Sequence, residues 1–260
     1  MSKEPLISFR NVQKAFGSKR IYVDLDLDVY EGETLVILGG SGVGKSVMLK
    51  MLVGLLTADA GTIMFDGKSL RELSERGFQE VRQQIAMLFQ GAALFDSLTV
   101  GENVAYALNE HHFRTMSKKD IEKRVAWALA LVGLPGIESM KPSDLSGGMR
   151  KRCGLARAIA LQPRVLLYDE PTTGLDPINA ERISHLVQGM KEELKVTSMV
   201  VTHDMKGAFA MADRLAMVLK GRIVFAGTPD EFRANTDPRI KDFIEGNAPK
   251  SESLESLMSN

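Results

Sequence analysis

The sequence predicts an α/β fold in which a mostly parallel sheet carries helices on both faces. Short, continuously apolar segments, typical of strands buried on both faces, recur at residues 34–38, 85–89, 164–168 and 197–201. Amphipathic helical segments lie between them, as expected for parallel strands joined by crossover helices. A long stretch of helical character, from Gly91 to about Ala160, interrupts this alternation and indicates an inserted helical subdomain.

The N-terminal part is expected to place antiparallel strands beside this sheet. Residues 24–29 alternate strictly between aspartate and apolar side chains, and this period of two predicts a half-exposed, antiparallel strand. The buried strand 34–38 leads through a glycine-rich loop into a helix over about residues 45–56. Residues 61–65 and the following Asp66-Gly67 indicate a strand and a turn. We therefore expect an antiparallel β edge on a parallel sheet.

The rest of the chain predicts two amphipathic helices, a hairpin and a well-marked helix start. Apolar residues recur at helical spacing over 121–132, and the segment 179–195 has the same amphipathic character. The apolar segments 215–219 and 222–226 flank Lys220-Gly221 and indicate a hairpin. Residues 228–231 combine a threonine cap, a proline at the first helical position and a glutamate three residues after the cap. The serine-rich residues 247–260 are expected to be mostly disordered.

Composition excludes several classes of protein. The chain has 260 residues, of which 44% are hydrophobic and 25% charged, which excludes a disordered or collagen-like chain. A single cysteine, Cys153, excludes an internal disulfide and fits a reducing compartment. The 33 basic and 33 acidic residues cancel, so we expect no nucleic-acid partner. No segment has the roughly 20 apolar residues that a membrane span needs, and the N-terminus does not resemble a signal peptide.

Residues 39–46 have the sequence GGSGVGKS, which fits the phosphate-loop pattern G-x-x-x-x-G-K-[ST]. Glycines let the backbone amides turn toward phosphate groups, and the start of the following helix adds positive potential. Lys45 would reach the terminal phosphates, and the hydroxyl of Ser46 would bind Mg²⁺. The alternative is a glycine turn with only a structural role. It does not explain why a strand, a glycine loop, a lysine, a serine and a helix occur together in the order that a phosphate-binding loop requires.

An apolar strand ends in two carboxylates, Asp169 and Glu170. The carboxyl ends of parallel strands form the edge at which ligands bind in such sheets. Asp169 would hold Mg²⁺ through water, and Glu170 would polarise the attacking water. An acidic turn without function is the alternative, and the neighbouring phosphate loop makes it the weaker one.

A second anion site is predicted where residues 145–149, LSGGM, precede a basic amphipathic helix over 150–161. Ser146 is a good helix cap, and a cap alone would be the structural interpretation. Two glycines after the serine, however, leave the helix start open to an anion. One phosphate loop and one further anion site suggest a nucleotide shared between two copies of the chain.

These motifs, with Gln90, Gly174-Leu175-Asp176 and His203, have the order and spacing found in ATP-binding cassette (ABC) ATPases, which this sequence resembles over roughly residues 6–235. The resemblance implies a P-loop NTPase (RecA-like) core that binds ATP and Mg²⁺. It also implies four segments: an N-terminal part of the core at 1–90, a helical signature subdomain at 91–162, a C-terminal part of the core at 163–235, and a C-terminal extension, mostly tail, at 236–260.

The resemblance assigns roles to individual residues. Lys45, Gln90, Glu170 and His203 would be catalytic, and Asp176 would lie at the interface between two copies. Phe16 would stack on adenine, and Ser146, Gly147 and Gly148 would contact the nucleotide of the opposite copy. The remaining nucleotide contacts would come from Gly39, Gly40, Ser41, Gly42, Val43, Gly44, Lys45, Ser46 and Val47. Mg²⁺ would be held by Ser46, Gln90 and Asp169. His111, His112 and His185 receive no role.

A narrower resemblance concerns residues 89–105 together with the LSGGM variant. Both are similar to ATPase subunits of Mla-type phospholipid transporters of bacterial envelopes, as are Asp237-Pro238-Arg239 and Phe243. Gly40 and Val47 depart from the commonest cassette pattern without removing a phosphate or metal contact. The resemblance implies a peripheral subunit on the cytoplasmic face of the inner membrane. Its partners would be a second copy, an integral permease, and a lipid-binding periplasmic protein reached through the permease.

Three other functions remain as alternatives. A cassette serving a transporter of another substrate would carry the same catalytic residues. A soluble ABC protein acting on ribosomes or DNA usually has two cassettes or a long coiled coil, and this chain has one cassette, no heptads and no basic excess. A small-molecule P-loop kinase would not explain the LSGG sequence.

Overall fold

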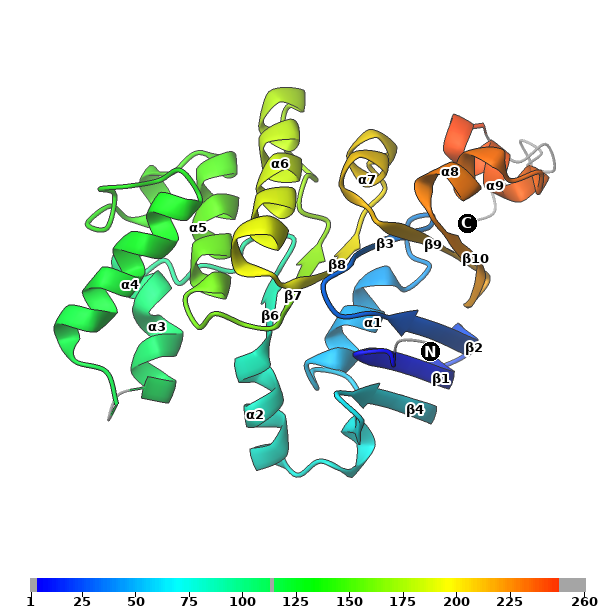
Figure 1. The fold of residues 1–260 in the computed structure, drawn as a ribbon, viewed down its shortest axis with the longest axis horizontal. Coiled ribbons are helices and arrows are strands. Elements are labelled where there is room, and N and C mark those ends of the chain that lie inside the picture. The colour runs from blue at the N-terminus through cyan, green and yellow to red at the C-terminus, as the bar shows by residue number, and fades with distance from the viewer. Residues whose placement is uncertain (1–3, 113–114, 248–260) are drawn as a thin grey trace.

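Two sheets organise the protein, for which the computed structural model describes residues 4–112 and 115–247 (Figure 1). Within these residues, the larger sheet has six strands in the order β10-β9-β3-β8-β7-β6. Strands β9, β3, β8, β7 and β6 run parallel, and β10 pairs antiparallel with β9. The smaller sheet is antiparallel, with the order β2-β1-β4-β5. The strands are β1 Ile7–Phe16, β2 Lys19–Val29, β3 Thr34–Leu38, β4 Ala60–Phe65, β5 Lys68–Ser69, β6 Ile85–Leu88, β7 Val165–Asp169, β8 Thr197–Val201, β9 Arg214–Leu219 and β10 Arg222–Gly227.

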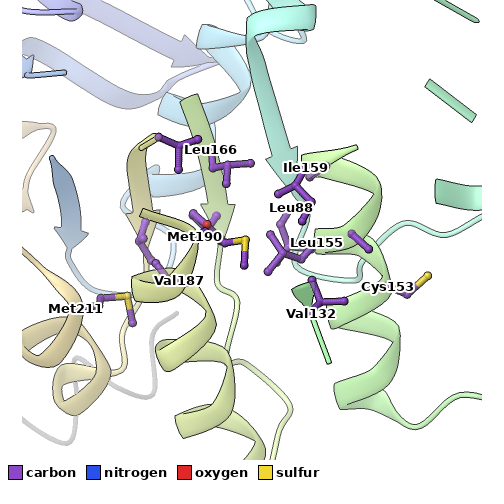
Figure 2. Packing of buried hydrophobic residues seen from close by; sticks show 14 of the residues in the cluster. Leu88, Val132, Cys153, Leu155, Ile159, Leu166, Val187, Met190 and Met211 are labelled. Carbon is purple, nitrogen blue, oxygen red and sulfur yellow. The ribbon is translucent and has the colours of Figure 1, made fainter. Parts of the chain in front are cut away.

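The larger sheet is buried on both faces, which explains the continuous apolar runs of its central strands. Every residue of β3, β7 and β8 is buried. Successive residues of β3 point to opposite faces: Leu35 and Ile37 pack in the cluster toward the smaller sheet, and Val36 and Leu38 pack in the cluster under the helices. Figure 2 shows the cluster under the helices, in which Leu166 of β7 packs with Leu155 and Val187, which come from two different helices.

Helices α3, α4 and α5 form a separate group at one end of the larger sheet (Figure 1). The last of the three also packs against β6, which connects the helical group to the sheet. No helix within the described ranges is both long enough and apolar enough to cross a membrane. The helices are α1 Lys45–Leu52, α2 Glu75–Gln84, α3 Val100–His112, α4 Lys118–Leu131, α5 Gly147–Ile159, α6 Pro177–Leu194, α7 Met205–Met211, α8 Pro229–Ala234 and α9 Pro238–Glu245, with short 3₁₀ turns at Leu70–Glu72 and Pro142–Asp144.

The structure confirms the predicted α/β fold with its parallel sheet and inserted helices, and it differs in detail. The antiparallel strands mostly form a sheet of their own, and only β10 lies at the edge of the parallel sheet. The helix expected over 45–56 ends at Leu52, because Gly54 adopts a left-handed conformation with φ 71°. The cap at Thr228 is confirmed: its side chain and that of Glu231 bond reciprocally to backbone amides. Residues 248–260, expected to be mostly disordered, lie outside the described residues.

Candidate functional site

The glycine-rich loop joins the carboxyl end of β3 to the start of α1, and two of its glycines are required by close contacts. Gly44 caps α1 in a left-handed conformation with φ 104°, and a side chain there would overlap Ile21 of β2. A Cβ atom at Gly39 would come within 2.9 Å of the Val218 carbonyl oxygen. The loop is therefore pressed against neighbouring strands, while Ser41, Gly42 and Gly44 line a cavity.

Lys45, the first residue of α1, folds back over this loop. Its side chain is buried, and its Nζ atom donates to the carbonyl oxygens of Gly39 at 2.8 Å and Gly40 at 3.1 Å. The same nitrogen lies 3.4 Å from Oε1 of Glu170. A buried ammonium group held only by carbonyls and one carboxylate can exchange these partners for the phosphate oxygens of a ligand.

Ser46 and Asp169 meet at the edge where β7 ends. The Ser46 hydroxyl donates to Oδ1 of Asp169 at 2.5 Å. Asp169 is only 5% exposed, and this burial raises the pKa of its carboxyl group, although the Ser46 hydrogen bond opposes the shift. A hydroxyl oxygen beside a carboxylate is a donor set suited to a hard divalent cation such as Mg²⁺.

Glu170 has a strained backbone and a carboxylate with three polar neighbours. Its φ of 49° lies in the left-handed region, which costs a residue with a side chain about 1 kcal/mol. Its backbone amide donates to the Val201 carbonyl at 2.9 Å, which fixes it against β8. Oε2 lies 2.8 Å from Nδ1 of His203 and accepts a 3.1 Å hydrogen bond from the Thr173 hydroxyl. The carboxylate is thus held among Lys45, His203 and Thr173.

These side chains surround a cavity of about 500 Å³. The structure brings nine of the predicted residues together here: six from the segment 41–47, together with Gln90, Glu170 and His203. Gln90 lies two residues after the end of β6 and is exposed, and His203 lies two residues after the end of β8. The lining residues are Ile21, Ser41, Gly42, Gly44, Lys45, Ser46, Val47, Gln90, Glu170, Thr173 and His203.

Other predicted residues do not line this cavity. Gly39, Gly40 and Val43 belong to the loop without reaching the wall, and Asp169 lies behind Ser46. Phe16 lies at the end of β1 with 47% of its surface exposed. The Nζ atom of Lys14 is 5.2 Å from the centre of the Phe16 ring. The ring is therefore available to a ligand without contributing to the cavity.

The LSGG residues lie at the start of α5, away from the cavity lining. Ser146 caps this helix by accepting a hydrogen bond from the amide of Met149. A Cβ atom at Gly148 would come within 3.2 Å of the side chain of Asn179, which lies in the first turn of α6. Asp176 caps α6 through the amides of Ile178 and Asn179. Within one chain, the two expected anion sites are therefore separate.

Three further residues support the site and were missed by sequence reasoning. Tyr22 of β2 is buried, which raises the pKa of its phenol, and its hydroxyl donates to the Gly44 carbonyl at 2.6 Å. Ile21 and Thr173 line the cavity. Thr173 follows Glu170 by three residues in a turn, and this spacing was the one feature of the sequence that could have indicated its place in the site. The contacts of Tyr22 and Ile21 depend on how β2 packs on the loop, which no local pattern indicates.

Arg157 of α5 supports the segment that follows Gln90. Its guanidinium donates to the carbonyl oxygens of Ala92 at 2.9 Å and Ala93 at 2.7 Å. Both alanines are left-handed, with φ of 62° and 50°. Two successive residues with side chains rarely adopt this conformation, so the arginine stabilises an otherwise unfavourable turn.

Comparison with known proteins identifies relatives that match most of the chain. The sequence model described as "ABC transporter" matches residues 22–173. The chain is 40% identical over 242 residues to the "Probable ribonucleotide transport ATP-binding protein mkl" of Mycobacterium leprae, covering 92% of this chain and 69% of that protein. It is 38% identical over 241 residues to the "Intermembrane phospholipid transport system ATP-binding protein MlaF" of Haemophilus influenzae, covering 93% of this chain and 90% of that protein.

Solved structures of similar fold support the same grouping. The cbiO1 protein of Clostridium perfringens, part of the transporter complex cbiONQ, superposes with a TM-score of 0.81 at 28% identity, covering 93% of this chain and 99% of that chain. A dimer of the cassette MJ0796 bound to ADP and Pi superposes with a TM-score of 0.79 at 30% identity, covering 86% of this chain and 98% of that chain.

Proposed function

This chain belongs to the ABC transporter family and acts as an ATPase of a transporter, and from that premise we propose that it powers phospholipid movement between bacterial envelope membranes. The observation that carries the ATPase site is the placement of Lys45, Glu170 and His203 around one cavity at the carboxyl edge of the parallel sheet. A cation that can bind phosphate and a carboxylate that can polarise water lie side by side at this cavity, and this pair suits in-line attack of water on a terminal phosphate.

In this proposal, each residue at the cavity has a distinct task. Lys45 exchanges its loop carbonyls for the terminal phosphate oxygens of ATP, and the loop amides of residues 41–44 contact the other phosphates. Glu170 polarises the attacking water, and His203, whose ring is oriented by its 2.8 Å contact with Glu170, contacts the phosphate being cleaved. Phe16 stacks on the adenine from outside the cavity.

The residues present fit a magnesium ion. Ser46 and Asp169 would hold it, the second through water, with Gln90 near by. In the described part of the chain, no group of three or more acidic, histidine or cysteine side chains could hold a metal ion alone. That fits Mg²⁺, which usually combines few protein ligands with waters and substrate phosphates. When bound, the ion would neutralise charge on the β- and γ-phosphates.

We further propose that two copies share two nucleotides, each bound between one phosphate loop and the Ser146–Gly148 segment of the other copy. The support is that these two sites do not meet within one chain and that a similar cassette has been solved as a dimer with ADP and Pi. In this arrangement, residues 91–162 would move as the helical signature subdomain, and nucleotide-driven closure would transmit force to the membrane subunit.

The membrane partner is proposed to dock in an apolar groove that follows the Gln90 turn. The groove, with a volume of about 590 Å³, is lined by Phe89, Ala93, Phe95, Tyr106 and Arg157 among others. Phe95 and Tyr106 are 42% and 43% exposed, with ring centroids 4.7 Å apart. An exposed aromatic pair directly beside the nucleotide sensor is suited to receive a helix of a permease. Docking there would hold the subunit at the cytoplasmic face of the inner membrane.

The substrate proposal depends on the relatives. The similarity to the phospholipid-transport proteins extends over nearly their full length, which favours a lipid; the mycobacterial relative, named for ribonucleotide transport, supplies the alternative. This subunit needs no enclosed site of the size of a lipid, because the permease and its periplasmic partner would determine which substrate is transported.

A deletion strain distinguishes these substrates. Loss of the gene should disturb the distribution of phospholipids between the envelope membranes and weaken the permeability barrier, and the wild-type gene should restore both. Uptake of labelled ribonucleotides, amino acids and metal ions should stay normal. A strain with a normal lipid distribution that fails to take up ribonucleotides would overturn the lipid proposal and leave the ATPase site standing.

A further inference from the structure

Lys151 is a buried lysine in the second turn of α5, and all three protons of its ammonium group have acceptors. Its Nζ atom donates to the carbonyl oxygens of Glu170 at 3.2 Å, Pro171 at 2.8 Å and Thr173 at 2.6 Å. The residue is 6% exposed. Burial lowers the pKa of this amino group, and the negative charge of Glu170 opposes that shift. All three hydrogen bonds of this lysine therefore go to one backbone turn.

That turn is the one that aims the Glu170 carboxylate. Glu170 is left-handed at its start, and Thr173 at its end donates its hydroxyl to Oε2 of Glu170. Three carbonyl oxygens therefore converge on one point, with their partial negative charges close together. A cation with three donors offsets this repulsion through charge-assisted hydrogen bonds, which are stronger than neutral ones.

We propose that Lys151 is a positioning residue for ATP hydrolysis, because it holds the Glu170–Thr173 turn in the conformation that directs the Glu170 carboxylate toward Lys45 and His203. The inference rests on the function proposed above for Glu170. Lys151 does not line the nucleotide cavity and touches none of the reacting atoms. Its effect should therefore appear in the chemical step rather than in the binding of ATP.

The position of Lys151 also connects two parts of the site. It follows Ser146 by five positions on the same helix, so a rigid α5 links the LSGG segment to the backbone of the catalytic glutamate. When the nucleotide of a second copy settles against the start of α5, the turn that carries Glu170 is held by the same helix.

The chain offers a matched control in the next residue. Arg152 also donates from α5 to backbone carbonyls, of Val132 at 3.3 Å and Gly133 at 3.0 Å. Those carbonyls lie at the end of α4, within the helical subdomain and away from the nucleotide cavity. Arg152→Met therefore removes a comparable carbonyl contact without touching the Glu170 turn.

The experiment uses the full chain purified with its membrane partner. We expect Lys151→Met to lower kcat by about 10- to 100-fold, the size of effect that a small misplacement of a catalytic group produces. The KM for ATP should stay within about threefold of wild type, because the interactions that bind substrate and transition state equally are unchanged. Lys151→Arg, which keeps the charge and the donors, should recover most of the loss, and Arg152→Met should keep kcat near wild type.

A double variant separates positioning from a general structural role. In a Glu170→Gln background, adding Lys151→Met should change the residual turnover by less than about twofold, since the carboxylate that it positions is already gone. If Lys151→Met does not fold, Lys151→Gln, which loses the charge but keeps two donors, takes its place in each comparison.

Three outcomes would overturn the inference: a wild-type kcat in Lys151→Met, a loss confined to the KM for ATP, or an equal loss in the wild-type and Glu170→Gln backgrounds. A failure of the proposed role of Glu170 would give a different result. If Glu170→Gln itself keeps wild-type turnover, the role proposed for Glu170 is wrong; if it loses turnover while Lys151→Met does not, only the role of Lys151 is wrong.

Discussion

The hydroxyl of Ser46 donates a 2.5 Å hydrogen bond to the carboxylate of Asp169, although 123 positions separate the two residues. This contact joins the first turn of α1 to the last residue of β7, so the phosphate loop and the acidic strand end form one unit. Because the carboxyl group is buried and its pKa is raised, a divalent cation that replaced the hydroxyl proton as its partner would stabilise the charged form.

The first prediction concerns this contact. Ser46→Ala should raise the Mg²⁺ concentration that half-saturates ATP hydrolysis by about 10-fold or more, comparable with losses caused by disturbing metal-site partners. The measurement is ATPase rate against Mg²⁺ at fixed ATP, for wild type and variant. Binding of ATP in the presence of EDTA should stay unchanged. An unaltered Mg²⁺ titration would remove Ser46 from the metal site.

The second prediction is that Lys45→Ala abolishes ATPase activity while the fold remains intact. The variant deprives the terminal phosphates of their cation, and it also leaves Glu170 without the neighbour that lies 3.4 Å from Oε1. Turnover should fall by at least about 100-fold, the scale expected for removal of one preorganised charge. Phosphate release is the assay, with circular dichroism and thermal unfolding as controls. Unchanged turnover would remove the phosphate-loop assignment.

The third prediction is that Glu170→Gln binds ATP, barely hydrolyses it and accumulates as a closed dimer. Glutamine keeps the size of the side chain and loses the basic oxygen that would polarise water. Size-exclusion chromatography with and without MgATP should show a nucleotide-dependent shift from monomer to dimer. The wild-type chain, which hydrolyses its ATP, should not hold the dimer under the same conditions. A variant that stays monomeric with MgATP would contradict the shared-nucleotide arrangement.

Sequence reasoning predicts the buried strands well and the N-terminal strand poorly, and one bulge explains the difference. The buried strands β3, β7 and β8 are marked by composition alone, because both faces are covered. Strand β1 was not predicted. Its apolar residues Ile7, Phe9 and Val12 break the period of two, because Asn11 is left-handed and the pairing with β2 shifts between Phe9 and Val12. Helix α2 was also missed, since only Val81 on it is buried.

The site divides in the same way between local and distant causes. The placement of Lys45, Ser46, Asp169, Glu170 and His203 at one edge of the sheet was predictable, because each lies at or after the end of a recognisable strand, and their catalytic roles remain a proposal. The residues that hold them were not predictable. The hydrogen bond from Tyr22 to Gly44 and the carbonyl contacts of Lys151 and Arg157 depend on packing between elements that are distant in sequence. The motifs identify the candidate site residues, whereas the contacts that hold them in place become apparent only in the three-dimensional structure.

The fourth prediction is that Cys153 does not react with thiol reagents in the folded protein. Its side chain is fully buried in α5, and burial raises the pKa of the thiol to about 11. At pH 8 the thiolate is therefore scarce as well as inaccessible. Labelling with a chromogenic disulfide reagent should be slow in buffer and reach one thiol per chain in guanidinium chloride. Rapid labelling of the native chain would show that α5 opens readily from the core.

The fifth prediction tests the apolar groove as the docking site of the membrane partner. Tyr106 is 43% exposed on α3 and contacts Phe95 with tilted rings, so Tyr106→Asp places a charge in the groove without disturbing a buried side chain. An aromatic residue at the centre of an interface commonly contributes about 2 kcal/mol or more, which corresponds to a roughly 30-fold loss of affinity. The variant should co-purify poorly with the membrane partner.

The control for this prediction is Lys123→Asp, which introduces the same aspartate at an exposed position of α4, outside the groove. It should co-purify with the membrane partner as wild type does. Both variants should bind ATP normally when assayed as isolated chains, because neither residue lines the nucleotide cavity. Equal recovery of the membrane partner by Tyr106→Asp and wild type would place the docking surface elsewhere. The nucleotide site would be unaffected, because the groove and the phosphate loop are built from different elements.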